Sequence, residues 1–261
     1  MIYTHNIHPI IISIGSVDLY WYGAMYAISF LLIDYMMKKE VVTNEIYKFN
    51  NNFIDRLVFI SIISVILGGR LGYVLFYNFE FYFLNIQKIF FIWEGGMSFH
   101  GALIGICVGL FFLSISSKIK FLKLCDFLVI FIPIGLFLGR IGNFINSELY
   151  GLPTKSDWGV VFPQIDMQPR HPSMLYEAFL EGIVLFLILL AVKRHNPATG
   201  ILSAVFLIFY SLFRFLVEFV RVPDLHIGYL YSTWLTMGMI LCIPMFFIGI
   251  LIYYFSKEGR I

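Results

Sequence analysis

Charged residues are scarce in this sequence. Asp, Glu, Lys and Arg make up 13% of its 261 residues, whereas hydrophobic residues make up 60%. The charged share is about half of that in a typical soluble domain, which excludes a water-soluble globule. A disordered chain is excluded too, because disorder needs low hydrophobicity and a high net charge. The formal net charge is only +2, so we expect no nucleic-acid partner, since nucleic-acid binding usually needs a basic surface.

Cysteine is also rare. Cys107, Cys125 and Cys242 lie far apart in apolar stretches, without the C-x-x-C pairs or even number that would indicate zinc binding or disulfides. We predict that they are buried core residues, as free cysteines often are. No cluster of Asp and Glu offers a site for a hard cation, and we expect neither a metal nor a cofactor.

Long stretches without Asp, Glu, Lys or Arg dominate the chain instead. Because a bilayer core needs about 20 apolar residues per helix, they predict an all-α, polytopic membrane protein with seven transmembrane helices. The predicted helices cover residues 17–37, 57–78, 96–115, 123–141, 175–192, 201–220 and 234–255. We predict one integral membrane domain over residues 1–261, with a loop at about 142–174 that glycine and prolines keep irregular.

The basic residues in the connections predict the orientation. Eleven Lys and Arg residues lie in connections on one side and five on the other. Since cytoplasmic loops retain basic residues, we predict that the N-terminus lies outside and the C-terminus in the cytoplasm. This places the loop at 142–174 on the outer face. The first 16 residues lack a basic n-region and a cleavage signal, so we expect the first span to be retained.

Two arginines, Arg70 and Arg214, stand inside predicted spans, where each costs at least about 2.5 kcal/mol on insertion scales. In the span at 201–220 and just beyond it, polar residues follow Tyr210 after four, eight and eleven positions. This spacing places them as a polar stripe on one helical face. Its members are Tyr210, Arg214, Glu218 and Arg221. The stripe must therefore face protein or water. One interpretation is an internal ion-pair network without chemistry; the other is a binding pocket.

The pocket is favoured because further polar residues share the outer depth of the membrane. They are Tyr22, His100, Arg140 and Asn143. Gly101, Gly105 and Gly109 form small-xxx-small steps that predict close helix packing. The segment HPSMLYE begins a helix at Pro172 or Ser173, and we interpret Ser173 as a cap; His171 and Tyr176 could line a pocket.

Several segments resemble the bacterial prolipoprotein diacylglyceryl transferases over about residues 20–245. They are GGRLGYVLFYN, GGMSFHGALIG, GRIGNFINSELYG, RHPSMLYEA and FRFLVEFVRVPD. The most specific element runs from Gly139 to Gly151 and fits the family signature at every fixed place. The resemblance implies a seven-span enzyme of the bacterial cytoplasmic (inner) membrane. Such an enzyme moves diacylglyceryl from phosphatidylglycerol, a membrane lipid, to the lipobox cysteine of a preprolipoprotein and releases glycerol phosphate.

The resemblance also implies site residues, with the site facing the outer leaflet. The main catalytic or headgroup-binding positions map onto His100, Arg140 and Arg214. Supporting positions map onto Tyr22, Asn143, Glu148, Gly151, Glu218 and Arg221. We add Arg70 and Tyr210 as substrate-binding candidates, because they are polar residues inside spans.

The chemistry fits these residues. A thiol with a pKa of about 8.5 is mostly protonated at neutral pH and needs a base, which His100 can supply; arginines suit the phosphate that leaves. A transporter is the main alternative, but it would need polar residues through the full membrane depth. A CDP-alcohol phosphatidyltransferase would need a D-x-x-D-G-x-x-A-R motif, which is absent. An intramembrane serine protease is disfavoured because Ser98 precedes His100 too closely.

Overall fold

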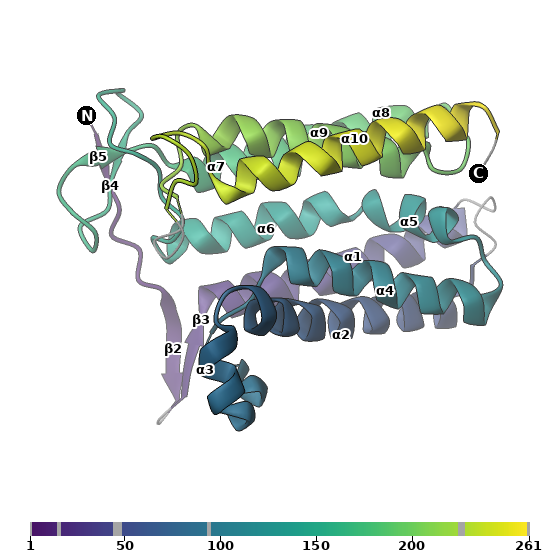
Figure 1. The fold of residues 1–261 in the computed structure, drawn as a ribbon, viewed down its shortest axis with the longest axis horizontal. Helices are drawn as coiled ribbons and strands as arrows, with labels where there is room; N and C mark the ends of the chain where they lie inside the picture. Colours follow the sequence, from purple (N-terminus) through teal and green to yellow (C-terminus); the bar gives the residue numbers. More distant parts are fainter. Residues whose placement is uncertain (1, 15–16, 44–48, 93–94, 224–227, 260–261) are drawn as a thin grey trace. The chain divides into compact units, whose positions relative to one another are not determined.

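A computed structural model describes residues 2–14, 17–43, 49–92, 95–223 and 228–259 (Figure 1). The chain is mostly helical. Its helices are α1 (Trp21–Thr43), α2 (Asn51–Phe76), α3 (Phe79–Leu84), η2 (Ile86–Phe90), α4 (Phe99–Ser117), α5 (Phe121–Val129), α6 (Ile132–Ile145), α7 (Ser173–Glu177), η4 (Ala178–Val184), α8 (Leu185–Lys193), α9 (Ile201–Glu218) and α10 (Met237–Lys257). Its short strands are β1 (Tyr3–Thr4), β2 (Ile10–Ile14), β3 (Val17–Tyr20), β4 (Val160–Val161) and β5 (Pro169–Arg170).

A helix lies at each of the seven predicted positions, and several are long and apolar enough to cross a membrane. These candidate spans are Asn51–Leu75, Ser173–Lys193, Ile201–Glu218 and Met237–Lys257, and the pair α5 and α6 makes a fifth if it counts as one span. The chain is therefore a multi-pass, mostly helical membrane protein. The full number of seven spans and the orientation stay predictions.

The span predicted at 123–141 is not one straight helix, which corrects the sequence analysis. It consists of α5 and α6, which are bent by 46° at a short break. Pro133 lies in the first turn of α6. Because proline has no N–H to continue the hydrogen bonds of the preceding helix, it favours a new helix start at this point.

The first predicted helix, 17–37, is also displaced. Val17–Tyr20 forms strand β3, which pairs antiparallel with β2, so α1 begins only at Trp21. At its other end α1 continues to Thr43. Lys38 pairs there with Asp34 one turn earlier at 2.8 Å and with Asp55 of α2 at 2.6 Å, and these pairs support the charged end of the helix.

Contacts divide the chain into two compact units, Met1–Ile33 with Asp126–Ile261, and Asp34–Cys125. In the second unit, α2 packs against α4 through glycines, as the small-residue steps predicted. A Cβ atom on Gly68 would lie 2.8 Å from the Cα of Gly105, and one on Gly105 would lie 2.9 Å from the Cα of Gly68. Only glycine allows the two backbones to approach this closely. The prediction of one membrane domain stays a prediction.

In the first unit, α9 and α10 run side by side (Figure 1), and α6 packs against α7 and η4. The loop at 142–174 is more regular than predicted, because β4 and β5 pair within it and β1 pairs in parallel with β4. Phe162 is fully buried there beside Val160 and Met174. Burial of this small apolar core fixes the loop against the helices that carry the charged side chains described below.

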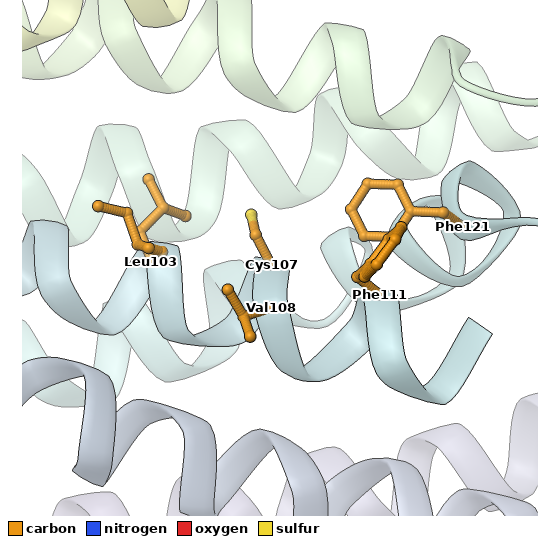
Figure 2. A pocket seen from close by; sticks show the side chains of 6 residues that line it. Leu103, Cys107, Val108, Phe111 and Phe121 are labelled. Atoms are coloured by element: carbon orange, nitrogen blue, oxygen red, sulfur yellow. The ribbon is translucent and has the colours of Figure 1, made fainter. Parts of the chain in front are cut away.

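The cysteines only partly follow the prediction of a buried core. Cys242 is buried and Cys125 is half-buried, but Cys107 is exposed on α4. Cys107 points into a pocket of about 410 Å³ that is otherwise lined by apolar side chains, among them Leu103, Val108 and Phe111 (Figure 2).

Candidate active site

Six ionisable side chains converge inside the first unit. Three are arginines and three are glutamates, and we call them the charged cluster: Arg140, Glu177, Glu181, Arg214, Glu218 and Arg221. They come from α6, α7, η4 and α9 and from the turn after α9. Charges in hydrocarbon are stable only when they are paired, and the cluster meets this requirement with equal numbers of the two signs.

Glu177 is the centre of the charged cluster. Its side chain is fully buried, and its Oε2 lies 2.6 Å from Nε of Arg140. Its Oε1 accepts hydrogen bonds from Nη1 of Arg221 at 3.1 Å and from Nη1 of Arg214. One carboxylate therefore aligns three guanidinium groups, two of which were predicted to act on the lipid headgroup.

Glu218 joins the cluster to α10. It accepts a hydrogen bond from Nη2 of Arg214 and another, 2.7 Å long, from the hydroxyl of Thr236. Thr236 also caps α10 by accepting from the backbone N–H of Met239 at 3.2 Å. Arg214 and Glu218 form an ion pair, as the interpretation of the polar stripe as an ion-pair network expects. The network extends further, because Glu177 joins Arg214 to Arg140 and Arg221.

Glu181 is held less well than the other two carboxylates. It is fully buried, and its closest ion-pair contact is 3.6 Å from Nη2 of Arg140. Neither of its oxygens makes a hydrogen bond within the described residues. It lies in η4, a π-helical segment between α7 and α8, and such bulges occur frequently at functional sites.

A polar extension of the charged cluster follows the end of α6. Nη1 of Arg140 lies 3.5 Å from Oδ1 of Asn143, whose amide donates to Glu148 at 3.2 Å. Tyr22 of α1 packs at the same level, since a Cβ on Gly142 would lie 3.1 Å from its ring. The structure therefore places Asn143 and Glu148 in a hydrogen-bonded row with Arg140, and Tyr22 packs against the same helix at Gly142.

Gly151 and Tyr210 both pack tightly against their neighbours. A Cβ atom on Gly151 would lie 2.5 Å from the carbonyl oxygen of Val220 and 2.6 Å from that of His171. Gly151 also forms an antiparallel bridge with Arg221, so the glycine fixes the backbone that presents this arginine. Tyr210 is 3% exposed, and its ring stacks on Phe206 at 5.7 Å.

The helix predicted at Pro172 or Ser173 begins at Ser173, but Ser173 is not its cap. Its hydroxyl donates to the carbonyl of Leu149 at 2.7 Å, so it binds the loop to the helix. His171 and Tyr176 line a pocket, as proposed, together with Trp158 and apolar residues of η4 and α9. Partial burial lowers the pKa of His171 below its usual value and so favours the neutral form of its ring.

Arg70 belongs to the second unit and has a different environment. Its guanidinium has five N–H groups, and each of the five donates to a backbone carbonyl. The acceptors are the carbonyls of Lys88, Ile89, Phe91, Gly95 and Gly96. It also lies over the ring of Tyr82, 5.0 Å from the centroid. Arg70 therefore organises the segment after α3, and its donors are fully used.

His100 lies in the first turn of α4, but its side chain is outside the described residues. The structure thus brings Arg140, Arg214, Glu218 and Arg221 together, while His100 and Arg70 belong to the second unit. Among the described residues, no group of three or more His, Cys, Asp or Glu side chains is placed to hold a metal ion.

Sequence reasoning missed Glu177 and Glu181. Glu177 entered only as the last residue of the segment HPSMLYE, and Glu181 was not considered. The available signal was their spacing of four residues inside an apolar span, which places both carboxylates on one helical face. Such a pair in hydrocarbon requires cationic partners.

The chain was compared with known proteins. The family model described as prolipoprotein diacylglyceryl transferase matches residues 9–255. Three relatives named phosphatidylglycerol–prolipoprotein diacylglyceryl transferase come from Methylococcus capsulatus, Rickettsia typhi and Pseudomonas aeruginosa, with 46%, 47% and 46% identity. Each alignment covers 94% of this chain, and 94%, 95% and 92% of the respective relative. The chain therefore belongs to the prolipoprotein diacylglyceryl transferase family.

Proposed function

We propose that this protein transfers the diacylglyceryl group of phosphatidylglycerol to the cysteine thiol of a prolipoprotein lipobox. A sulfur–carbon bond forms, and the bond between the glyceryl carbon and the phosphate oxygen breaks. The electron pair of that bond leaves with glycerol phosphate, and the thiol gives up its proton to a base. Membership in the family supports this reaction.

The observation that carries the proposal is the unused hydrogen-bonding capacity of two arginines. Arg214 uses two N–H groups on carboxylates, and Arg140 makes one contact at 2.6 Å and longer ones at 3.5 and 3.6 Å. Each guanidinium has five donors, so both retain donors for an anion. Their side chains are 15% and 14% exposed. Arg70, by contrast, has no donor left for a phosphate.

Arg140 and Arg214 would bind the lipid phosphate and stabilise the charge that develops as it leaves. Glu177 holds both guanidinium groups in place, so no reorganisation is needed when the lipid arrives. Asn143, Glu148 and Tyr22 extend this surface and would orient the glycerol headgroup. His100 would accept the thiol proton, since histidine is the residue type that most often serves as a general base.

In the proposed topology the chain has seven spans in the bacterial cytoplasmic membrane, with the N-terminus outside and the active site toward the outer leaflet. This proposal rests on the eleven-to-five distribution of basic residues. It can be tested in a variant without native cysteines by introducing single cysteines near Thr4, Asp157 and Lys120. The first two should react with an impermeant reagent added from outside and the third should not; the opposite pattern would reverse the orientation.

The proposed reaction can be tested with purified protein, labelled phosphatidylglycerol and a lipobox peptide. We expect a thioether-linked diacylglyceryl peptide and one glycerol phosphate per turnover. A peptide with serine in place of the lipobox cysteine is the control and should remain unmodified. If folded, purified protein yields no thioether from these two substrates, the proposed function is wrong.

A further inference from the structure

The charge balance of the cluster constrains how it can bind a phosphate. Its three arginines and three glutamates sum to zero if all are ionised. A lipid phosphodiester that binds to Arg140 and Arg214 adds one negative charge in a site of low dielectric. Burial of an uncompensated charge is costly, so one of the carboxylates must lose its charge or leave.

The contacts distinguish the three carboxylates. Glu177 touches three guanidinium groups, and Glu218 is held by Arg214 and by the hydroxyl of Thr236. Glu181 is fully buried without a hydrogen bond to either oxygen among the described residues, and its nearest guanidinium nitrogen is 3.6 Å away. Its ionised form is therefore stabilised least.

Among the described residues, no other carboxylate near Glu181 is as weakly held. The thiol of Cys242 on α10 interacts electrostatically with Glu181, but a neutral thiol carries no negative charge to lose. Ionisable groups on the helices packed against η4 are Arg140 on α6, Glu177 and Tyr176 on α7, and Tyr210, Arg214 and Glu218 on α9. Arg221, which follows α9, contributes a further positive charge. On α8 the charged residue is Lys193 at the far end. The arginines cannot lose their protons in a protein, and Glu177 is held by three of them.

We propose that Glu181 is a positioning residue of the phosphate site, and that it takes up one proton from the solvent when a lipid phosphodiester binds to Arg140 and Arg214. This inference rests on the proposed function of the two arginines. The carboxylate becomes a neutral acid, the phosphate keeps its charge, and the total charge of the site stays constant. The proton returns to solvent when glycerol phosphate leaves.

The proposal can be tested by titrating phosphatidylglycerol into the protein in maltoside micelles. Calorimetry in two buffers with different ionisation enthalpies gives the number of protons taken up per lipid. We expect about one proton for the wild type, and a dissociation constant that rises by up to about tenfold per pH unit once Glu181 is ionised in the free protein, as proton linkage requires. Glu181→Gln should bind lipid without proton uptake and with an affinity independent of pH.

Three variants make the result specific. Glu181→Asp keeps a carboxyl group and should keep the proton uptake, and Glu80→Gln on α3 is a control that should behave as wild type. His100→Gln should also take up the proton. Uptake that persists in Glu181→Gln, that is lost in His100→Gln, or that is absent from the wild type would overturn the proposal. Failure of the proposed function is distinct, because it would appear as no thioether product from the wild-type protein.

Discussion

Replacement of Glu177 tests the central contact of the charged cluster. Glu177→Gln preserves the size of a fully buried side chain that contacts Arg140, Arg214 and Arg221, but removes its charge. Three guanidinium groups then share two carboxylates. Loss of one partner from a buried ion pair costs about 3 to 5 kcal/mol. Because Arg140 and Arg214 are 15% and 14% exposed, water can screen part of this effect, and we expect a loss of about 3 kcal/mol.

Phosphatidylglycerol should offset much of this loss in the variant. Its phosphate supplies the missing negative charge to the same guanidinium groups. A ligand present at 100 times its dissociation constant stabilises the folded state by about 2.7 kcal/mol. Lipid should therefore stabilise Glu177→Gln more than the wild type, in which Glu177 already supplies a negative charge to the three arginines.

The measurement is the thermal unfolding midpoint in maltoside micelles, with and without phosphatidylglycerol. A loss of about 3 kcal/mol corresponds to a decrease of about 6 to 12 °C for a chain of this size. Diacylglycerol, which has the acyl chains but no phosphate, should not restore the midpoint. Asp126→Asn is the matched control. Asp126 is a buried carboxylate that accepts hydrogen bonds from Gly200 and Ser203 at the start of α9. Its loss should destabilise the fold, and phosphatidylglycerol should stabilise this variant no more than it stabilises the wild type.

Two results would refute the reasoning. If Glu177→Gln unfolds at the wild-type temperature, the carboxylate does not hold the arginines. If diacylglycerol restores the variant as well as phosphatidylglycerol does, the effect comes from acyl chains and the arginines do not bind phosphate.

Four further variants test individual residues. Arg214→Lys should reduce transfer at least about tenfold, the equivalent of about 1.4 kcal/mol, because lysine cannot bridge two partners in a planar fork; retained transfer in the peptide assay would favour a purely structural ion pair. Arg70→Lys has at most three donors for five carbonyls and should lower the unfolding midpoint while the KM for phosphatidylglycerol stays unchanged; a raised KM with unchanged stability would instead place Arg70 at the headgroup. Gly151→Ala should reduce both stability and transfer, because its Cβ would lie 2.5 Å from a backbone oxygen, and wild-type values for both would show that the loop can move. His100→Gln should lose most transfer at pH 7 and approach the wild-type rate above about pH 8.5, where the peptide thiol ionises unaided; a constant rate ratio would remove the base role from His100.

The sequence predicted the helices well where the physical cause was local. Apolar stretches fixed the approximate positions of the helices, and the glycine steps on α4 correctly predicted close packing, here against α2. Departures occurred where pairing between segments decided the structure. Residues 17–20 joined a hairpin with β2, and the loop at 142–174 acquired two paired strands. Hydropathy alone does not contain this pairing information.

The candidate site was predictable in part, for the same reason. Arginines inside a membrane span stand out in a sequence, because their insertion into hydrocarbon costs free energy and therefore indicates a role. The family signature around Arg140 pointed to that arginine as well. Their partners were not visible. Glu177 lies 37 residues from Arg214 and 44 from Arg221 in the chain, and no local rule connects positions so far apart.

By itself, the sequence determined that this protein lies in a membrane, that its helices follow its apolar stretches, and which family it resembles. The tertiary structure decided which arginines keep hydrogen-bond donors that no acceptor among the described residues occupies. Arg70 and Arg214 are equivalent by sequence, since both are cations inside apolar helices. The fold surrounds Arg70 with five carbonyl oxygens and leaves donors of Arg214 unused beside Glu177 and Glu218. The physical reason is that a guanidinium has a fixed number of donors, and only the packing of distant segments determines which acceptors occupy them.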